Sequence, residues 1–414
     1  MKKSIWPSAV DGVVAAPPSK SVAQRAIALA ALAAGESLIH GAGNSDDVLA
    51  ATNIITALGA KVCQKDNALH IIGGHLNPQR VLHCGESGLC LRMFSGIAAA
   101  LGDEITLTGH GSLLKRPLDD VVDALSALGV KCISNNGFAP LTIRGPMRGG
   151  HHKTDASHSS QLLSGLLMAV SLLNTNTTLI VEKMVSKPYV ELTIDVMRVY
   201  GVQVINNRFR EFIIKAGQRY EPADFHVEGD WSGAAFMLVA GAVAGTVTVQ
   251  NLNNDSRQAD KKILDVLNAA GAARKHSGKF FQVSKHRLRA FSFDATDCPD
   301  LFPPLVALAA NCTGVSRIAG VRRLHGKESD RAQSLTNTFS KLGIQIKTGD
   351  NEMLVRGGKI TGGTVSAHGD HRIAMAAAIA ALTADSPVHI TGADAVNKSY
   401  PGFFDDLEKI TGNC

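Results

Sequence analysis

The segment ITALGAKV, residues 55–62, decides the fold of this chain. Small and apolar residues at helical spacing end on Gly59, and a short strand-like run follows. A glycine just past a helix supplies the left-handed residue that closes the last turn, so the segment predicts a helix that stops and continues into a strand. The pattern recurs at intervals of 69 to 72 residues, at Gly129, Gly201, Gly271, Gly343 and Gly412.

Six copies at one spacing indicate an internal repeat. The copy at Gly412 is the weakest, because the sequence ends before the strand that should follow. Alanine-rich runs such as residues 26–35 predict closely packed helices, and β-branched runs such as residues 105–109 predict strands. Three repeats in each half is the symmetric division, with a boundary in the polar stretch 221–230. We therefore predict an α/β chain of two domains.

Polar residues gather at two phases of this repeat, about 40 residues and 12 to 16 residues before each glycine. Residues at one phase occupy equivalent places, so we expect both sets at the starts of equivalent helices, where backbone N–H groups favour anions. Asp46-Asp47 and Ser256-Arg257 are equally well explained as helix caps and solvated charge. The other clusters include Lys20, Ser21, Arg25, Gly88, Ser160, Asp300 and Arg372 at the first phase, and Arg116, Tyr189, Glu328, Arg331 and Lys398 at the second.

Composition narrows the class of protein. The chain has 414 residues, 45% of them apolar, and a net charge of +6 with only 5% aromatic residues, which disfavours nucleic acid as a partner. Neither a secretory signal nor an apolar run of membrane-spanning length is present, and neither glycine-rich nucleotide motif occurs. Seven cysteines without a Cys-x-x-Cys pair predict free thiols. We expect a monomeric, cytoplasmic protein that acts on small molecules without cofactor, metal, nucleic acid or membrane.

Seven short motifs together resemble the 5-enolpyruvylshikimate-3-phosphate synthase (EPSP synthase) family. They follow the family's order and cover the chain from Lys20 to Phe404. The motifs are KSVAQR at 20–25, KRP at 115–117, SSQ at 159–161, SKPY at 186–189, KESDR at 327–331, GDHR at 369–372 and KSYP at 398–401. The resemblance implies two domains, each of three βαβαββ units around a pseudo-threefold axis, with the active site in the cleft between them. The expected domains are residues 18–228 and residues 1–17 plus 229–414.

The resemblance also implies transfer of the enolpyruvyl group of phosphoenolpyruvate to the 5-hydroxyl of shikimate 3-phosphate. Both substrates are multiply anionic, so a site with many fixed cations is physically required. The implied phosphoenolpyruvate site is Lys20, Gly88, Arg116, Gln161, Arg331, Arg372 and Lys398. The implied shikimate 3-phosphate site is Lys20, Ser21, Arg25, Ser159, Ser160, Gln161, Ser186, Tyr189, Asp300 and Lys327. The expected catalytic residues are Asp300, Glu328, Lys20 and Lys327.

Addition followed by elimination needs a positioned acid and a positioned base. We assign Asp300 to the sugar hydroxyl and Glu328 to the methylene carbon, with the opposite assignment left open. An ion pair between Glu328 and Arg331, three residues on along a helix, is compatible with either role.

The chain departs from the family's pattern in the loop before Arg92. Glu86 and Leu89 stand where an asparagine and a threonine are common, and Arg323 stands where one branch has asparagine. A carboxylate near an anion site repels anionic ligands unless it is paired or turned away. We therefore expect weakened inhibition by glyphosate.

Two other functions compete with this interpretation. A UDP-N-acetylglucosamine enolpyruvyl transferase typically carries a cysteine in a mobile loop of its first domain, yet no cysteine lies between Cys90 and Cys132. A non-catalytic binding protein of the same fold would not need two carboxylates among its cations. Phosphate release with each acceptor substrate distinguishes all three.

Overall fold

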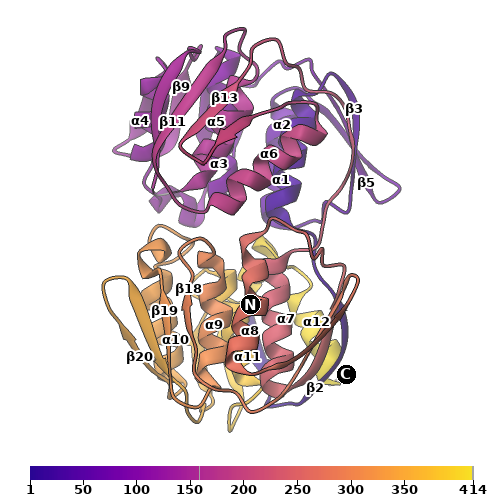
Figure 1. Ribbon diagram of the computed structural model, residues 1–414, viewed down its shortest axis with the longest axis vertical. Helices are drawn as coiled ribbons and strands as arrows, with labels where there is room; N and C mark the ends of the chain where they lie inside the picture. The colour runs from indigo at the N-terminus through magenta and orange to yellow at the C-terminus, as the bar shows by residue number, and fades with distance from the viewer. Residues whose placement is uncertain (158, 413–414) are drawn as a thin grey trace. The chain divides into compact units, whose positions relative to one another are not determined.

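Residues 1–157 and 159–412 are described by the computed structural model (Figure 1). The chain forms two compact units. One is Lys20–Val227, and the other joins Met1–Ser19 to Glu228–Cys414. None of the helices in the described part of the chain has both the length and the apolar character needed to cross a bilayer.

The six repeat glycines end six helices, as the sequence predicts. Each glycine has a positive φ, from 67° at Gly412 to 104° at Gly59, in the region that a side chain disfavours. The backbone N–H of Gly59 donates to the carbonyl of Thr56 and so closes the last turn. These helices are α2 (Asp46–Ala57), α4 (Asp119–Ala127), α6 (Lys187–Val199), α8 (Ile263–Ala270), α10 (Arg331–Lys341) and α12 (Phe403–Thr411).

A second set of six helices alternates with the first. They are α1 (Lys20–Leu32), α3 (Gly88–Leu101), α5 (Ser160–Val170), α7 (Trp231–Ala244), α9 (Phe302–Ala310) and α11 (His371–Ala381). These helices are buried almost throughout, and every residue of α7 and α11 is buried. Their small side chains permit close packing of helices. The first-phase clusters lie at the starts of these helices, which confirms the placement expected from the repeat.

Each repeat in the unit Lys20–Val227 contributes to a four-stranded sheet with one parallel pair followed by antiparallel pairs. The sheet orders are β14-β3-β5-β4, β6-β7-β9-β8 and β10-β11-β13-β12. The strands are β3 (Gly35–His40), β4 (Lys61–Lys65), β5 (Ala68–Gly73), β6 (Val81–His83), β7 (Glu104–Thr108), β8 (Lys131–Asn135), β9 (Phe138–Arg144), β10 (His151–Ala156), β11 (Thr177–Met184), β12 (Ile205–Asn207), β13 (Glu211–Ile214) and β14 (Asp224–His226). A 3₁₀ turn, η1 (Gly111–Lys115), precedes α4.

The unit that joins Met1–Ser19 to Glu228–Cys414 repeats this topology, with sheet orders β16-β17-β15-β2, β18-β19-β21-β20 and β1-β23-β22. Its strands are β1 (Lys2–Ile5), β2 (Val10–Ala15), β15 (Gly245–Gln250), β16 (Ala273–Ser277), β17 (Phe280–Ser284), β18 (Ser292–Asp294), β19 (Val315–Ala319), β20 (Gln345–Thr348), β21 (Glu352–Arg356), β22 (Gly363–Ser366) and β23 (Val388–Thr391). Its 3₁₀ turns are η2 (Ala259–Lys262), η3 (Pro299–Leu301), η4 (Val321–Leu324) and η5 (Ala393–Lys398).

The sixth sheet has three strands, and one of them comes from the other end of the chain. Strand β1 pairs antiparallel with β23, in the register Lys2 to Thr391 and Ile5 to Val388. The sixth sheet is thus completed by residues that precede the first repeat.

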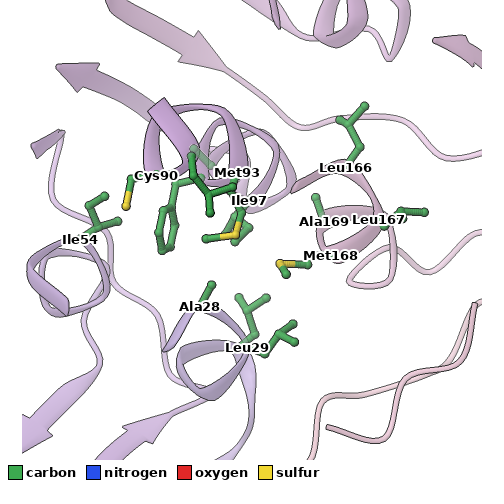
Figure 2. Packing of buried hydrophobic residues seen from close by; sticks show 14 of the residues in the cluster. Ala28, Leu29, Ile54, Cys90, Met93, Ile97, Leu166, Leu167, Met168 and Ala169 are labelled. Atoms are coloured by element: carbon green, nitrogen blue, oxygen red, sulfur yellow. The ribbon is translucent and has the colours of Figure 1, made fainter. Parts of the chain in front are cut away.

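The core of the unit Lys20–Val227 lies among α1, α3 and α5. Figure 2 shows Ala28, Met93 and Met168, one from each helix, directed into the space that these helices share. A Cβ atom built on Gly96 of α3 would lie 2.9 Å from the backbone of Gly165 in α5. Two glycines therefore set how closely these two helices approach, and larger residues there would separate them.

Candidate active site

Arg331, at the start of α10, is the centre of a cluster of charges in the unit that contains Glu228–Cys414. Its side chain is 1% exposed and contacts three carboxylates. Nη1 donates to Asp300 Oδ1 at 2.6 Å, Nη2 to Glu328 Oε2 at 2.5 Å, and Nε to Asp370 Oδ2 at 2.8 Å. The ion pair expected between Glu328 and Arg331 is present. One guanidinium therefore holds both candidate catalytic carboxylates in position.

Two lysines and a second arginine complete the cluster. Arg372 Nη2 lies 3.2 Å from Asp300 Oδ2, and Lys327 Nζ lies 3.7 Å from Asp300 Oδ1. Lys398, 6% exposed in η5, has its Nζ 3.9 Å from Glu328 Oε1. All six residues that the sequence places in this half of the site are thus brought together.

The cations control the charge state of Asp300. Partial burial alone would raise the pKa of this carboxyl. The neighbouring Arg372, Lys327 and Arg331 outweigh burial and hold the pKa well below the usual aspartate value. Asp300 is therefore ionised at every working pH.

The pKa of Lys327 is lowered as well, but for a lysine this shift favours the neutral form. Partial burial, with the like charges of Arg331 and Arg323, lowers the pKa of Lys327 to about 8, against the attraction of Asp300 and Glu328. A lysine with this pKa exchanges a proton near neutral pH, which suits a residue that binds or transfers protons.

Asp370 also belongs to the cluster. It lies in the GDHR motif but is not among the site residues that the sequence predicts. Its side chain is 0% exposed and caps α11 by accepting from the backbone N–H of Arg372 at 3.0 Å. It also accepts from Ser329 Oγ at 3.1 Å. Asp370 fixes the starts of α10 and α11 relative to each other and so positions Arg331 and Arg372.

The unit Lys20–Val227 carries the other predicted residues. Lys20, the first residue of α1, forms a 2.7 Å ion pair with Asp47 of α2. Gln24 lies one turn further along α1 and donates to Asp47 O and to Ser87 Oγ. Ser87 in turn caps α3 by accepting from Cys90 N. The starts of three helices are therefore tied together beside the Lys20 ammonium.

Arg25 is enclosed by protein acceptors. Its side chain donates to Thr193 Oγ1 at 2.8 Å and to Ser21 O at 2.7 Å, with longer contacts to Ser164 Oγ and Tyr189 O. It is 2% exposed, and burial lowers its pKa to about 10. Four of its N–H groups are directed to protein. This geometry supports a positioning function for Arg25, which joins α1, α5 and the first turn of α6.

The remaining predicted residues of this unit lie at two helix starts. Ser159 caps α5 by accepting from Gln161 N at 3.2 Å, and Ser160 begins the helix. Ser186 precedes α6 with φ of 54°, a left-handed conformation that is uncommon without glycine. Tyr189 N donates to Ser186 O in the first turn. The two helix starts present hydroxyl groups together with backbone N–H groups, a combination that suits phosphate oxygens.

Gly88 begins α3 directly beside Arg116. A Cβ atom built on Gly88 would lie 2.3 Å from Arg116 Nη1 and 3.6 Å from Arg92 Nη1. Arg92 in turn donates to Pro117 O at 2.9 Å and forms a 3.4 Å pair with Asp120. Only glycine leaves the guanidinium of Arg116 in its present place.

Replacing Gly88 by alanine is expected to displace Arg116 and to raise the KM for phosphoenolpyruvate about 10-fold or more, with a smaller effect on the KM for shikimate 3-phosphate. The methyl group cannot occupy the position of Arg116 Nη1. Steady-state kinetics check this result. Gly358→Ala is the matched control, because a Cβ there meets nothing within 4 Å. Equal changes in both KM values would contradict a specific effect on Arg116.

Glu86 does not lie as a free carboxylate. Its Oε2 accepts from Ser112 N at 2.9 Å and from Ser112 Oγ at 2.7 Å, at the start of η1. The carboxylate is thus bound to Ser112 and keeps its negative charge. Leu89 is 7% exposed within the core. Weakened glyphosate inhibition stays a prediction.

The same cross-helix contact recurs through the repeats. In each case a residue in the first turns of the earlier helix, or of the 3₁₀ turn before it, bonds to a residue of the later helix or of the 3₁₀ turn before that helix, 27 to 31 positions on. The contacts among the described residues are Lys20–Asp47, Arg92–Asp120, Ser164–Thr193, Ser232–Asp260 and Asp300–Arg331. The fold therefore places a polar pair at an equivalent position in five repeats. Several of these pairs lie in the candidate site.

Asp260 is a buried acid that the sequence motifs did not reveal. It is 0% exposed in η2 and accepts from Ser232 Oγ. Burial, and then the charge of Asp300, raise its pKa from 3.8 to about 7, although Arg372 opposes the shift. Its position 11 residues before Gly271, near the second phase, was the available signal.

Asp260 is expected to make stability depend on pH. A carboxyl with a raised folded-state pKa binds its proton more tightly in the folded chain, so stability falls as the pH rises from about 4 to about 7. Asp260→Asn removes this loss. The melting temperature of the variant should therefore exceed that of the parent at pH 8, with a smaller or reversed difference at pH 5. Thermal unfolding across this range measures it.

Asp265→Asn provides the control for that measurement. Asp265 is 64% exposed and pairs with Lys262 at 3.0 Å, so its replacement should leave the pH profile unchanged. A difference between Asp260→Asn and the parent that is constant from pH 5 to pH 8 would contradict the assignment.

Comparison with known proteins accounts for the arrangement. The model of the family EPSP synthase (3-phosphoshikimate 1-carboxyvinyltransferase) matches residues 6–407. The chain belongs to the EPSP synthase family. A 3-phosphoshikimate 1-carboxyvinyltransferase of Methanocorpusculum labreanum is 38% identical over 416 residues, which cover 99% of this chain and 98% of that protein. A protein of the same name from Clostridium kluyveri is 37% identical, with 99% and 97% covered.

Solved structures agree with this membership. The EPSP synthase of Acinetobacter baumannii has a TM-score of 0.82 and 25% identity, and the alignment covers 99% of this chain and 98% of that one. The two-domain α/β fold expected for the EPSP synthase family is therefore confirmed, as is the resemblance carried by the seven motifs.

Proposed function

We propose that this chain transfers the enolpyruvyl group of phosphoenolpyruvate to the 5-hydroxyl of shikimate 3-phosphate and releases phosphate. The observation that carries the proposal is the cluster around Arg331, in which Asp300 and Glu328 lie among buried cations. Simple capture of an anion does not require carboxylates, because they repel it. Membership of the EPSP synthase family over residues 6–407 supplies the substrates and the reaction.

The residues divide into binding and proton-transfer functions. We propose that five cations hold the phosphate and carboxylate of phosphoenolpyruvate. These are Lys20, Arg116, Arg331, Arg372 and Lys398. The hydroxyls and amides at the starts of α1, α5 and α6 would hold shikimate 3-phosphate, with Gln161 in contact with both substrates. Ser21, Ser159, Ser160, Ser186, Tyr189 and Lys327 belong to this set, and Arg25 positions it.

The reaction proceeds by addition and then elimination. The 5-hydroxyl oxygen bonds to the vinyl carbon of phosphoenolpyruvate while the methylene carbon gains a proton. The bond between the attacked carbon, which now carries the 5-oxygen, and the phosphate oxygen then breaks, and the new methyl group loses a proton. Asp300 is ionised and accepts the hydroxyl proton. Glu328 transfers the proton to the methylene carbon and later accepts one from the methyl group. Fixed cations stabilise the charge on the departing phosphate.

A phosphate-release assay tests the function. Purified protein with phosphoenolpyruvate and shikimate 3-phosphate should release one phosphate for each enolpyruvyl product. UDP-N-acetylglucosamine in place of shikimate 3-phosphate should release none. Turnover with the nucleotide sugar alone, or binding of both substrates without turnover, would overturn the proposal.

We also propose that the protein acts in the cytoplasm as a monomer. The six cysteines in the described part of the chain are all free, and four of them are buried, including Cys90 and Cys312. Free thiols are typical of a reducing compartment. Light scattering of the eluted protein tests the monomer, since a mass near 43.6 kDa is then expected.

A further inference from the structure

Three side chains with metal-binding groups meet on the edge strand of one sheet and its inner neighbour. His40 ends β3, and Asp224 and His226 both belong to β14. The strands are parallel neighbours, with His226 paired to His40 and Asp224 paired to Leu38. Side chains alternate along a strand, so Asp224 and His226 project from one face of β14. The register therefore brings two imidazoles and a carboxylate together from segments far apart in the sequence.

Distances within this cluster match those around a small metal ion. One ligand atom from each residue lies within 4.8 Å of the others. Asp224 Oδ1 lies 2.9 Å from His40 Nε2 and 3.8 Å from His226 Nε2. Ligands of a tetrahedral ion with bonds of about 2.0–2.2 Å are roughly 3.4 Å apart. Small side-chain rotations are enough to reach that geometry.

We propose that His40, Asp224 and His226 form a binding site for a transition-metal ion of the Zn²⁺ class. Two imidazole nitrogens and one carboxylate oxygen are a donor set that Zn²⁺ accepts, with water at the fourth position. Asp224 and His226 are 62% and 78% exposed, so solvent reaches two of the three ligands, and the Nε2 atom of His40 is buried beneath them. Among the described residues, His40, Asp224 and His226 form the group of His, Cys, Asp or Glu side chains whose ligand atoms converge closely enough to hold a metal ion.

A His–Asp ion pair alone accounts less well for the arrangement. The two imidazole rings are stacked, with centroids 4.4 Å apart and planes 14° apart. Both ring nitrogens approach the same carboxylate oxygen, so two protonated rings would repel each other with only one negative charge between them. A divalent ion replaces both protons and satisfies all three groups.

The ion would connect distant parts of one unit. Strand β14 has three residues and lies at the edge of its sheet, where it joins the end of the unit Lys20–Val227 to β3 near its beginning. A metal bridge between these strands would stabilise the closure of the unit, because the ion binds the folded arrangement and not the separated strands. This inference is independent of the proposed catalytic activity.

Metal titration of tag-free, chelator-treated protein tests the site. We expect calorimetry with ZnCl₂ to show one ion per chain and a higher melting temperature in its presence. Co²⁺ should give the intense visible absorption of a four-coordinate ion with nitrogen and oxygen ligands. His226→Ala and Asp224→Asn should each weaken binding at least about 10-fold, the smallest effect expected for loss of a direct ligand. Both residues are exposed, so the variants should fold.

His70→Ala is the matched control. His70 of β5 lies 2.8 Å from Glu36 of β3 and opposite the exposed Cys63, so it offers a competing pair on the same sheet. Its replacement should leave the one-ion stoichiometry and the affinity unchanged. Loss of Zn²⁺ binding in His70→Ala, or unchanged binding in both His226→Ala and Asp224→Asn, would overturn the proposal.

Discussion

Turnover should fall about 10²- to 10⁴-fold in Glu328→Gln and in Asp300→Ala, the range typical of general acid–base catalysis. Each change removes a carboxylate that the cations around Arg331 hold in place. Because proton transfer acts in the transition state, kcat should decrease while binding of shikimate 3-phosphate remains measurable. Steady-state phosphate release and calorimetry separate the two effects.

Loss of a carboxylate also changes the charge of a buried cluster, so the experiment needs a control for folding. Glu352→Gln makes the same chemical change in an exposed ion pair with Arg317 and should keep normal turnover. The melting temperatures of all variants should be compared at one pH. Near-normal kcat in a folded Glu328→Gln or Asp300→Ala protein would remove that residue from the mechanism.

The repeat made much of the fold predictable from sequence. Gly59 and its five counterparts each require a left-handed conformation, which only glycine adopts without strain, so the helix ends could be read directly. The role of β1 could not be read in this way. Its pairing with β23 joins residues from opposite ends of the chain, and four residues of strand carry no local signal of their partner.

The candidate site was predictable to the extent that its residues lie in local motifs. Asp300, Arg331 and Arg372 occupy helix starts at repeat positions, and the structure brings them together. Asp260 escaped notice because its neighbours in sequence form no motif, and its importance depends on burial beside Ser232. The hydrogen bond of Glu86 could not be predicted, because its partner Ser112 lies 26 residues away. Burial and distant partners are properties of the folded chain.

Asp370→Ala should lower the free energy of unfolding by about 3–5 kcal/mol, the usual result of removing one partner from a buried ion pair. Asp370 and Arg331 are 0% and 1% exposed, and the pKa of Arg331 is raised because the surrounding carboxylates, Asp370 foremost, outweigh its burial. Without Asp370, the guanidinium keeps its charge but loses a 2.8 Å acceptor, and α11 loses its cap. Most of the lost stability arises because the buried charge of Arg331 is kept out of water and is no longer fully compensated by acceptors.

Asp330→Ala isolates the contribution of the cap from that of the buried charge. Asp330 caps α10 by accepting from Gln333 N at 3.2 Å, but its side chain is 52% exposed. Loss of an exposed cap costs about 1 kcal/mol, so the two variants should differ by at least about 2 kcal/mol. Urea unfolding, followed by two independent probes because the chain has two units, measures both values. Equal losses would mean that Asp370 acts only as a cap, and that Arg331 obtains its position from Asp300 and Glu328.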